Sequence, residues 1–259
     1  MPSHMSAGCR TLILLYNTMW GAAPDVEGPH LPNRCELTTD KSRFQEATAV
    51  VFHIPSLRES LPPARPPGQV WVAWSMECEV HYPRLRDAQF MRHFDLTMTY
   101  HHDADVPVPY YGPDLLPALQ GTPAPKANDR LTALFMSSPY DKSGRRKLAT
   151  ELMRYLDIHS YGRDLRNRWL EEDRGRATKL EVIASYRFTL AFENAIAPDY
   201  VTEKFFDPLV AGSVPVYLGA PNVDQFAPAD HCFVDVTDFG TPRGLADYLL
   251  TLNLSLIHI

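Results

Sequence analysis

One segment constrains this chain more than any other: residues 188–204 place a strand, a polar loop and a helix start in direct succession. The apolar run Phe188–Phe192 is typical of a buried strand and turns polar at Glu193-Asn194. Asp199 and Thr202 are both favourable N-cap residues for a helix that follows. The segment therefore predicts a strand end and a helix start at one edge of a sheet.

The predicted helix has its own sequence signals. Glu203 places a negative charge in the first turn, where the helix dipole favours it, and Gly212 is a plausible stop. Pro208 removes one helical hydrogen bond and is expected to kink the helix. We expect free backbone N–H groups at the helix start, with Lys204 beside them, to form an anion site that best suits a diphosphate.

The composition excludes several classes of protein. The net charge of −6 gives no general affinity for nucleic acid, and no apolar run approaches the roughly 20 residues of a membrane span. The first 20 residues lack the pattern of a signal peptide, which favours a soluble, unexported chain. The four cysteines contain no CxxC pair, so we expect free thiols and no zinc site, and a Cys9–Cys35 bridge stays open.

Apolar runs alternate with helical patterns along the chain, which indicates an α/β fold with parallel sheets. The expected strands are 11–16, 49–53, 70–75, 96–100, 131–136, 189–192, 214–217 and 233–236. The expected helices are 145–156, 165–185, 203–211 and 245–252. The Pro-rich stretch 105–130 reads as a loop and linker, which places a domain boundary near residue 126.

The order of unusual residues in 192–219 is specific enough to identify a family. FENA, followed by YVTEKFFDPLVAGSVPVYLG, resembles the donor-binding signature of the α-1,3/α-1,4-fucosyltransferases, although Ala195 stands where Ser is common. Cys35–Asp40 and Ala49–His53 are similar to two further family segments.

The resemblance implies a fold and a function. It implies two Rossmann-like lobes with an interdomain cleft, the GT-B type of glycosyltransferase, with an acceptor-side domain over 1–125 and a GDP-fucose domain over 126–253. The expected reaction is inverting transfer of fucose from GDP-fucose to a hydroxyl of an N-acetylglucosamine-type glycan of the lactosamine kind. Neither the acceptor, the α-1,3 or α-1,4 linkage nor the oligomeric state can be read from the sequence.

The catalytic base is expected on the first lobe. Glu77 follows the apolar run Val70–Ser75, and carboxylates at the carboxyl ends of parallel strands commonly face a ligand. A base there would take the proton of the attacking hydroxyl. Glu77 is the family's candidate base, although the Ser-Pro that often follows it is missing, and Glu79 is a rival two residues away.

The donor-binding residues are expected on the second lobe. The family pattern has an Arg seven residues before a Leu, and counting back from Leu152 selects Arg145. The resemblance implies that Arg145 and Lys204 neutralise the leaving GDP. The other donor-binding residues that the resemblance implies are Glu193, Asn194, Tyr200 and Glu203.

No metal ligand is predicted. Asp103-Ala104-Asp105 is a DxD, which elsewhere holds a divalent ion, but three residues are a weak signal and we favour a structural turn. A metal is therefore expected to stimulate the reaction at most. The chain also contains no P-loop, no dinucleotide fingerprint and no G-x-S-x-G motif, which disfavours those classes of enzyme.

Several alternatives stay open from the sequence. Another nucleotide-sugar donor, a non-catalytic sugar-binding module and a metal-dependent transferase are the competing functions. The segment Met76–Tyr100, which contains Tyr82–Leu85, looks closer to bacterial members. Together with the lack of an apolar run long enough for a membrane anchor, it favours a cytoplasmic bacterial protein over a Golgi-lumen fragment of an anchored enzyme. Family members usually continue beyond Asn253, so the apolar tail 254–259 is expected to mark a truncation, with an incomplete second lobe and activity left open.

Overall fold

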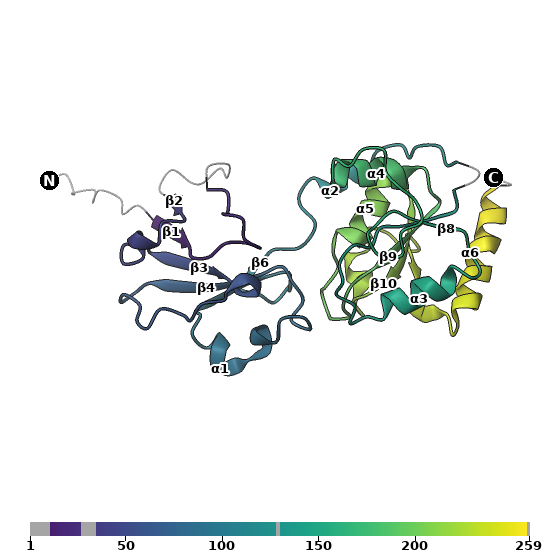
Figure 1. The fold of residues 1–259 in the computed structure, drawn as a ribbon. Helices are drawn as coiled ribbons and strands as arrows, with labels where there is room; N and C mark the ends of the chain where they lie inside the picture. Colours follow the sequence, from purple (N-terminus) through teal and green to yellow (C-terminus); the bar gives the residue numbers. More distant parts are fainter. Residues whose placement is uncertain (1–10, 27–34, 128–129, 258–259) are drawn as a thin grey trace. The chain divides into compact units, whose positions relative to one another are not determined.

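The computed structural model describes residues 11–26, 35–127 and 130–257, and the chain divides into two compact units at Val108–Pro109 (Figure 1). This division lies inside the Pro-rich stretch, ahead of the boundary near residue 126 that the sequence predicts. That stretch also contains a short helix, α2 (Leu115–Leu119), which packs on α5 of the second unit.

The first unit is built on a parallel sheet with the strand order β2-β1-β3-β4-β5-β6. Its strands and helix are β1 (Thr11–Leu15), β2 (Cys35–Thr38), β3 (Ala49–His53), β4 (Val70–Ser75), α1 (Ala88–Met91), β5 (Leu96–Thr99) and β6 (Val106–Pro107). Three short 3₁₀ helices cover Lys41–Arg43, Ile54–Ser56 and Pro83–Arg86. One sheet face buries alternate residues such as Leu14, Phe52 and Trp71 beneath α1.

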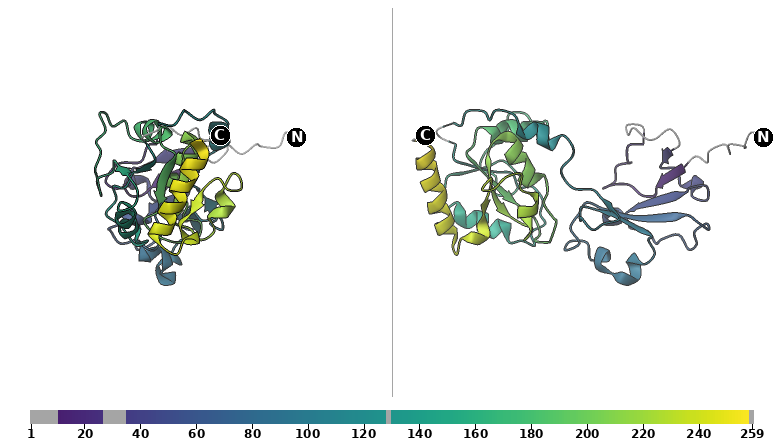
Figure 2. Two further views of the ribbon diagram at one scale, coloured as in Figure 1. Left: turned by 90° about the vertical axis from the view of Figure 1, so that its right-hand side faces the viewer. Right: turned by 180° about the vertical axis from the view of Figure 1, so that it is seen from behind.

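The second unit is a parallel sheet with the strand order β11-β10-β9-β7-β8. Figure 2 shows its C-terminal helix, in yellow, along one side of this unit. Its elements are β7 (Thr132–Leu134), α3 (Arg145–Leu152), β8 (Ile158–Ser160), α4 (Arg176–Ala184), β9 (Phe188–Phe192), α5 (Glu203–Ala211), β10 (Val214–Leu218), β11 (Val234–Asp235) and α6 (Pro242–Ile257). Two 3₁₀ helices cover Val223–Phe226 and Val236–Asp238.

Helices cover both faces of the second sheet because its central strands are apolar on both sides. In β9, Phe188, Leu190 and Phe192 pack with α3 and α6, whereas Ala191 packs with α5 on the opposite face. The α/β fold with two parallel-sheet lobes is therefore confirmed.

Three predicted helices have different bounds, and the one predicted over 145–156 already ends at Leu152. Residues 165–175 are not helical, because Leu165 and Gly175 both have left-handed φ values, of 55° and 67°, and α4 starts only at Arg176. Conversely, α6 continues to Ile257, beyond the predicted end at residue 252. No described helix is both long enough and apolar enough to cross a membrane.

The described thiols of Cys35, Cys78 and Cys232 are free. The alternative Cys9–Cys35 bridge involves Cys9, which lies outside the described residues.

Candidate active site

The start of α5 is built around a buried carboxylate. Thr202 is the N-cap, and its Oγ1 accepts a 3.4 Å hydrogen bond from the amide of Lys204. The Glu193 carboxylate, at the end of β9, accepts hydrogen bonds of 2.8 Å from the Thr202 amide and 2.9 Å from the Thr202 hydroxyl. The Phe205 amide donates to the Thr202 carbonyl. The expectation of free N–H groups is therefore wrong for these three amides, because protein oxygens already accept from them.

Lys204 is held in the same network. Its Nζ donates to Thr202 Oγ1 at 2.9 Å and lies 3.1 Å from Glu203 and 3.4 Å from Glu193. Burial lowers the pKa of Lys204, but the two carboxylates outweigh burial and raise it above its ordinary value. Lys204 is thus a charged side chain in a fixed position.

The two acids beside Lys204 have different environments. Glu193 is completely buried, and burial raises its pKa. Burial also acts to raise the pKa of Glu203, but Lys204 and Lys179 outweigh it and lower the pKa. The lowered pKa keeps Glu203 ionised. Its side chain is 43% exposed, so a ligand can reach Glu203 but not Glu193.

Arg145 begins α3 and is 2% exposed. Its guanidinium donates to the carbonyls of Phe192, Ser138 and Tyr140 at 3.0–3.2 Å. Burial lowers its pKa. Arg145 therefore ties the end of β9 to the loop after β7, and its Nε has no hydrogen-bond partner among the described residues.

A pocket of about 660 Å³ opens beside this network, within the second unit. Arg145, Glu203 and Lys204 line it together with residues from the loops after β7 and β8 and from α4. Its charged lining residues are Arg145, Arg163, Arg166, Asp173, Lys179, Glu203 and Lys204. Five cations against two acids give this pocket a net positive lining, which favours an anionic ligand.

Three of the predicted donor-binding residues do not line this pocket. Glu193 lies beneath the Thr202–Lys204 turn, and the backbone carbonyl of buried Asn194 accepts from the amides of Lys142 and Ser143. Tyr200 is 2% exposed, and its ring centroid lies 6.2 Å from that of Tyr110. Glu193, Asn194 and Tyr200 therefore do not belong to the lining of the pocket.

The pocket also contains residues that sequence reasoning missed. Arg163 and Arg166 follow β8, a strand that the sequence did not predict, and Tyr161 stacks on Phe135 with ring centroids 5.1 Å apart. A Cβ on Gly162 would lie 2.1 Å from the Met136 carbonyl oxygen, so only glycine permits this approach of two strand ends. The available signal was the sequence Tyr161-Gly162-Arg163, which starts three residues after the β-branched Ile158.

The predicted base belongs to the first unit. Glu77 follows β4, and Ser75 Oγ contacts both its amide and its carbonyl, at 3.1 and 2.9 Å. Glu77 and Glu79 line a hollow of about 240 Å³ at the carboxyl ends of β4 and β5.

The surroundings of Glu79 distinguish it from Glu77. Its carboxylate accepts a hydrogen bond from the Tyr100 hydroxyl, lies 3.0 Å from Arg86 and lies 3.5 Å from His101. Burial acts to raise the pKa of Glu79, but hydrogen bonds from His101, Tyr100 and Arg86 outweigh it and hold the pKa well below its ordinary value. A carboxylate stabilised in this way is a weak proton acceptor.

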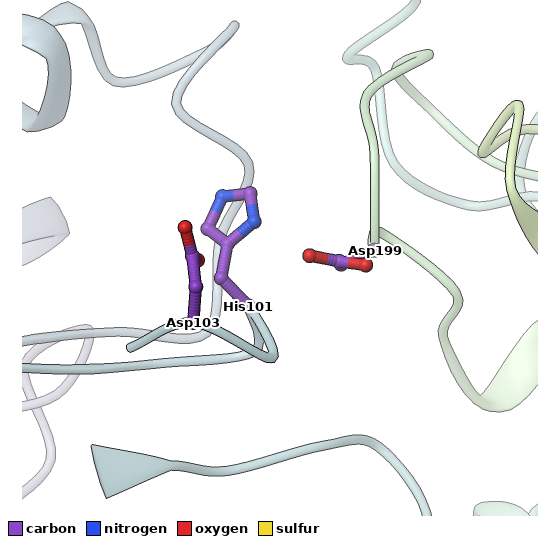
Figure 3. Close-up of side chains that lie close together, drawn as sticks. All are labelled: His101, Asp103 and Asp199. Atoms are coloured by element: carbon purple, nitrogen blue, oxygen red, sulfur yellow. The ribbon is translucent and has the colours of Figure 1, made fainter. Parts of the chain in front are cut away.

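The DxD segment forms the turn after β5. Asp105 accepts from the Thr97 amide at 2.8 Å and from the Thr97 hydroxyl at 2.9 Å. Figure 3 shows His101 and Asp103 on the same loop. The carboxylate of Asp105 therefore closes the turn onto β5.

Two parallel α/β units, one with a cationic pocket beside a helix start, define the class of two-lobed glycosyltransferases. The model of glycosyltransferase family 10 (fucosyltransferase), C-terminal part, matches residues 125–255, and that of the fucosyltransferase N-terminal part matches residues 9–111. The chain therefore belongs to the fucosyltransferase family, glycosyltransferase family 10.

Individual relatives agree with this assignment. Human alpha-(1,3)-fucosyltransferase 7 is 37% identical over 86% of this chain and 64% of its own length. The rat 4-galactosyl-N-acetylglucosaminide 3-alpha-L-fucosyltransferase 9 is 34% identical over 83% of this chain and 59% of its own. A crystal structure titled as an alpha1,3-fucosyltransferase with GDP-fucose shares the fold, with a TM-score of 0.62, 18% identity and coverage of 98% of this chain and 81% of the other.

The Drosophila alpha-(1,3)-fucosyltransferase B is 31% identical over 83% of this chain. The match covers 53% of the Drosophila protein, so the chain spans only part of such relatives. These curated relatives come from animals and lend no support to the bacterial origin that Tyr82–Leu85 indicated.

Proposed function

We propose that this chain carries the machinery for inverting transfer of fucose from GDP-fucose to a hydroxyl of an N-acetylglucosamine-type acceptor. The observation that carries the proposal is the pocket of about 660 Å³ at the start of α5, lined by five cations. A diphosphate supplies the negative charge that such a lining requires. The names of the relatives support fucose as the sugar and a 4-galactosyl-N-acetylglucosaminide as the acceptor.

Residues of the pocket would act on the donor in distinct ways. Lys204 and the remaining N–H groups of Arg145 would bind the diphosphate and stabilise the charge that grows on GDP as the glycosidic bond breaks. Ionised Glu203 would accept hydrogen bonds from fucose hydroxyls and stabilise positive charge at the anomeric carbon.

The residues behind the pocket would support this arrangement. Glu193 fixes Lys204 and Thr202, and the Asn194 carbonyl holds the amides ahead of α3. Buried Tyr200 supports the loop before α5 and accepts, through its carbonyl, a 3.4 Å hydrogen bond from the Tyr217 hydroxyl. We propose positioning roles for all three residues.

In the proposed mechanism, Glu77 takes the proton of the acceptor hydroxyl as the oxygen attacks the anomeric carbon and the bond to GDP breaks. Glu79 is the weaker candidate, because Tyr100, Arg86 and His101 already stabilise its ionised form. A single displacement of this kind inverts the anomeric configuration.

We propose that no metal ion is required, since the pocket's own cations can neutralise the diphosphate. Full transfer in excess chelator is the expected result. Activity that disappears with chelator and returns with Mg²⁺ would favour the metal-dependent alternative through Asp103 and Asp105.

Binding calorimetry and product analysis test the proposal. We expect GDP to bind, Lys204→Met to weaken that binding, and proton NMR of the product to show an α-linked fucose. Tighter binding of UDP than of GDP would favour another nucleotide-sugar donor. Glycan binding without GDP release, unaffected by Glu77→Gln, would favour a non-catalytic sugar-binding module.

A further inference from the structure

The first unit carries an exposed tryptophan that the proposed mechanism does not use. Trp20 is 53% exposed, at the carboxyl side of β1, and its φ of 53° lies in the left-handed region. A bulky residue in that region is a conformational outlier, and such outliers concentrate at binding sites. The conformation therefore calls for an explanation beyond local packing.

Contacts on three sides fix the position of Trp20. Its amide donates to Ser56 Oγ at 2.9 Å, and a bridge between Met19 and Ala22 closes the turn around it. Its ring centroid lies 5.4 Å from His53 and 5.9 Å from Tyr82. The indole is thus held in place while half of its surface stays open to solvent.

The side chain beneath the Trp20 ring, His53, is aromatic and uncharged near neutral pH. Burial lowers the pKa of His53 to about 4, so the imidazole is uncharged near neutral pH. His53 also packs against Trp74 at 5.4 Å, and its Nδ1 has no hydrogen-bond partner among the described residues. An unused hydrogen-bonding atom therefore lies in the layer beneath Trp20.

Two hollows are lined by residues that contact Trp20, one by Ser56 and the other by Tyr82. One, of about 400 Å³, contains Lys41, Ser56 and Glu59, and the other, of about 340 Å³, contains His81 and Tyr82. Arg58 lines both. Lys41 and Glu59 form a 2.6 Å ion pair, so the first hollow offers hydrogen-bonding groups with part of its charge balanced.

The location in the sheet also favours a ligand. β1 has β2 on one side and β3 on the other, so the connections diverge between β1 and β3. Ligands of open parallel sheets bind outside the carboxyl ends of the strands at such a switch point. Trp20 follows β1 and contacts Ser56 and His53 at the end of β3, which places it at this point.

We infer that Trp20 is a platform for a pyranose ring of the acceptor glycan, with Tyr82 and Arg58 at its margins. The apolar face of a sugar ring covers the exposed indole, and polar groups in the two hollows bind its hydroxyls. Trp20 follows β1 and Glu77 follows β4, two parallel strands of one sheet, so the platform lies at the same carboxyl edge of the sheet as the proposed base. This inference rests on the proposed function for the nature of the sugar.

The test is a kinetic comparison on the full chain, with N-acetyllactosamine as the acceptor. We expect Trp20→Ala to raise the acceptor KM about tenfold or more through loss of apolar contact area, and to leave the KM for GDP-fucose unchanged. Trp20→Phe should recover part of the loss. Tyr155→Ala, which removes another exposed aromatic ring on the second unit, is the control and should change neither KM.

Trp20→Gly separates binding from folding, because glycine adopts the left-handed conformation without strain. We expect its Tm to stay close to that of the native chain, while its acceptor KM rises as it does in Trp20→Ala. An unchanged acceptor KM in Trp20→Ala, or a large fall in Tm in both variants, would overturn the inference.

Saturation-transfer NMR with N-acetyllactosamine alone reports on the platform without the donor. The native chain could give a saturation-transfer signal that Trp20→Ala abolishes and yet show no fucosyl transfer. That result would support the sugar platform and contradict the proposed reaction. Absence of a signal together with normal transfer and an unchanged acceptor KM would reject the platform alone.

Discussion

Asp207 of α5 lies 2.8 Å from Lys179 of α4 and is itself 1% exposed. The same carboxylate lies 2.8 Å from Arg176. Lys179 lines the cationic pocket, whereas Arg176 does not, and the Arg176 side chain is 62% exposed. The buried acid therefore fixes one cation at the pocket and another outside it.

This relationship predicts a difference between two similar substitutions. Lys179→Gln should weaken GDP binding about ten- to hundredfold, since a charged hydrogen bond contributes roughly 1.5–3 kcal/mol. Arg176→Gln removes the other partner of Asp207 and should leave GDP binding within about twofold. Calorimetric titration with GDP measures both. If both variants lose the same amount of GDP affinity, the loss comes from the disturbed contact between Asp207 and α4 and not from a direct contact of Lys179 with GDP.

Glu77 and Glu79 allow a second matched comparison. Glu77→Gln should lower kcat by about 10²–10⁴ because the base is removed, with little change in Tm. Glu79→Gln should lower kcat much less and reduce Tm, because it breaks the contacts with Tyr100 and Arg86. Steady-state rates and thermal unfolding of both variants decide the assignment. If Glu79→Gln is the slower enzyme while its Tm is unchanged, the roles are reversed.

The lowered pKa of Glu79 predicts how stability depends on pH. Its folded-state pKa lies below the value of 4.5 expected for the unfolded chain, so the stabilisation is complete above pH 4.5 and is lost as the pH falls through the folded-state pKa. The difference in unfolding free energy between the native chain and Glu79→Gln should therefore be constant near neutral pH and shrink in acid. Urea unfolding across this range measures it, and a difference that grows in acid would contradict the assignment.

Gly162 is predicted to be irreplaceable for a steric reason. An added Cβ would lie 2.1 Å from a backbone oxygen of Met136, so Gly162→Ala should destabilise the second unit by about 1–3 kcal/mol. Gly240→Ala meets no atom within 4 Å and should be nearly neutral. Denaturant unfolding of both variants measures the two free energies of unfolding. If Gly162→Ala is as stable as Gly240→Ala, the segments after β7 and β8 can move apart to accept the added Cβ.

The sequence predicted the apolar elements better than the polar contacts. The bounds of β3, β4 and α5 are as expected, because each has a clear apolar run or strong capping residues. β8 was missed because its three residues include a polar His159, and with it Arg163 and Arg166 were missed. Glu193 was expected to bind the donor, but its burial beneath Thr202 depends on a contact between separate elements that no local pattern reveals.

GDP release is the most direct test of the proposed donor and the proposed reaction. The full chain is incubated with GDP-fucose and N-acetyllactosamine, and the GDP formed is measured against a panel of UDP-sugars. The account predicts acceptor-dependent GDP release that Lys204→Met and Glu77→Gln each greatly reduce. Turnover of a UDP-sugar without turnover of GDP-fucose, or GDP release unaffected by both substitutions, would contradict it.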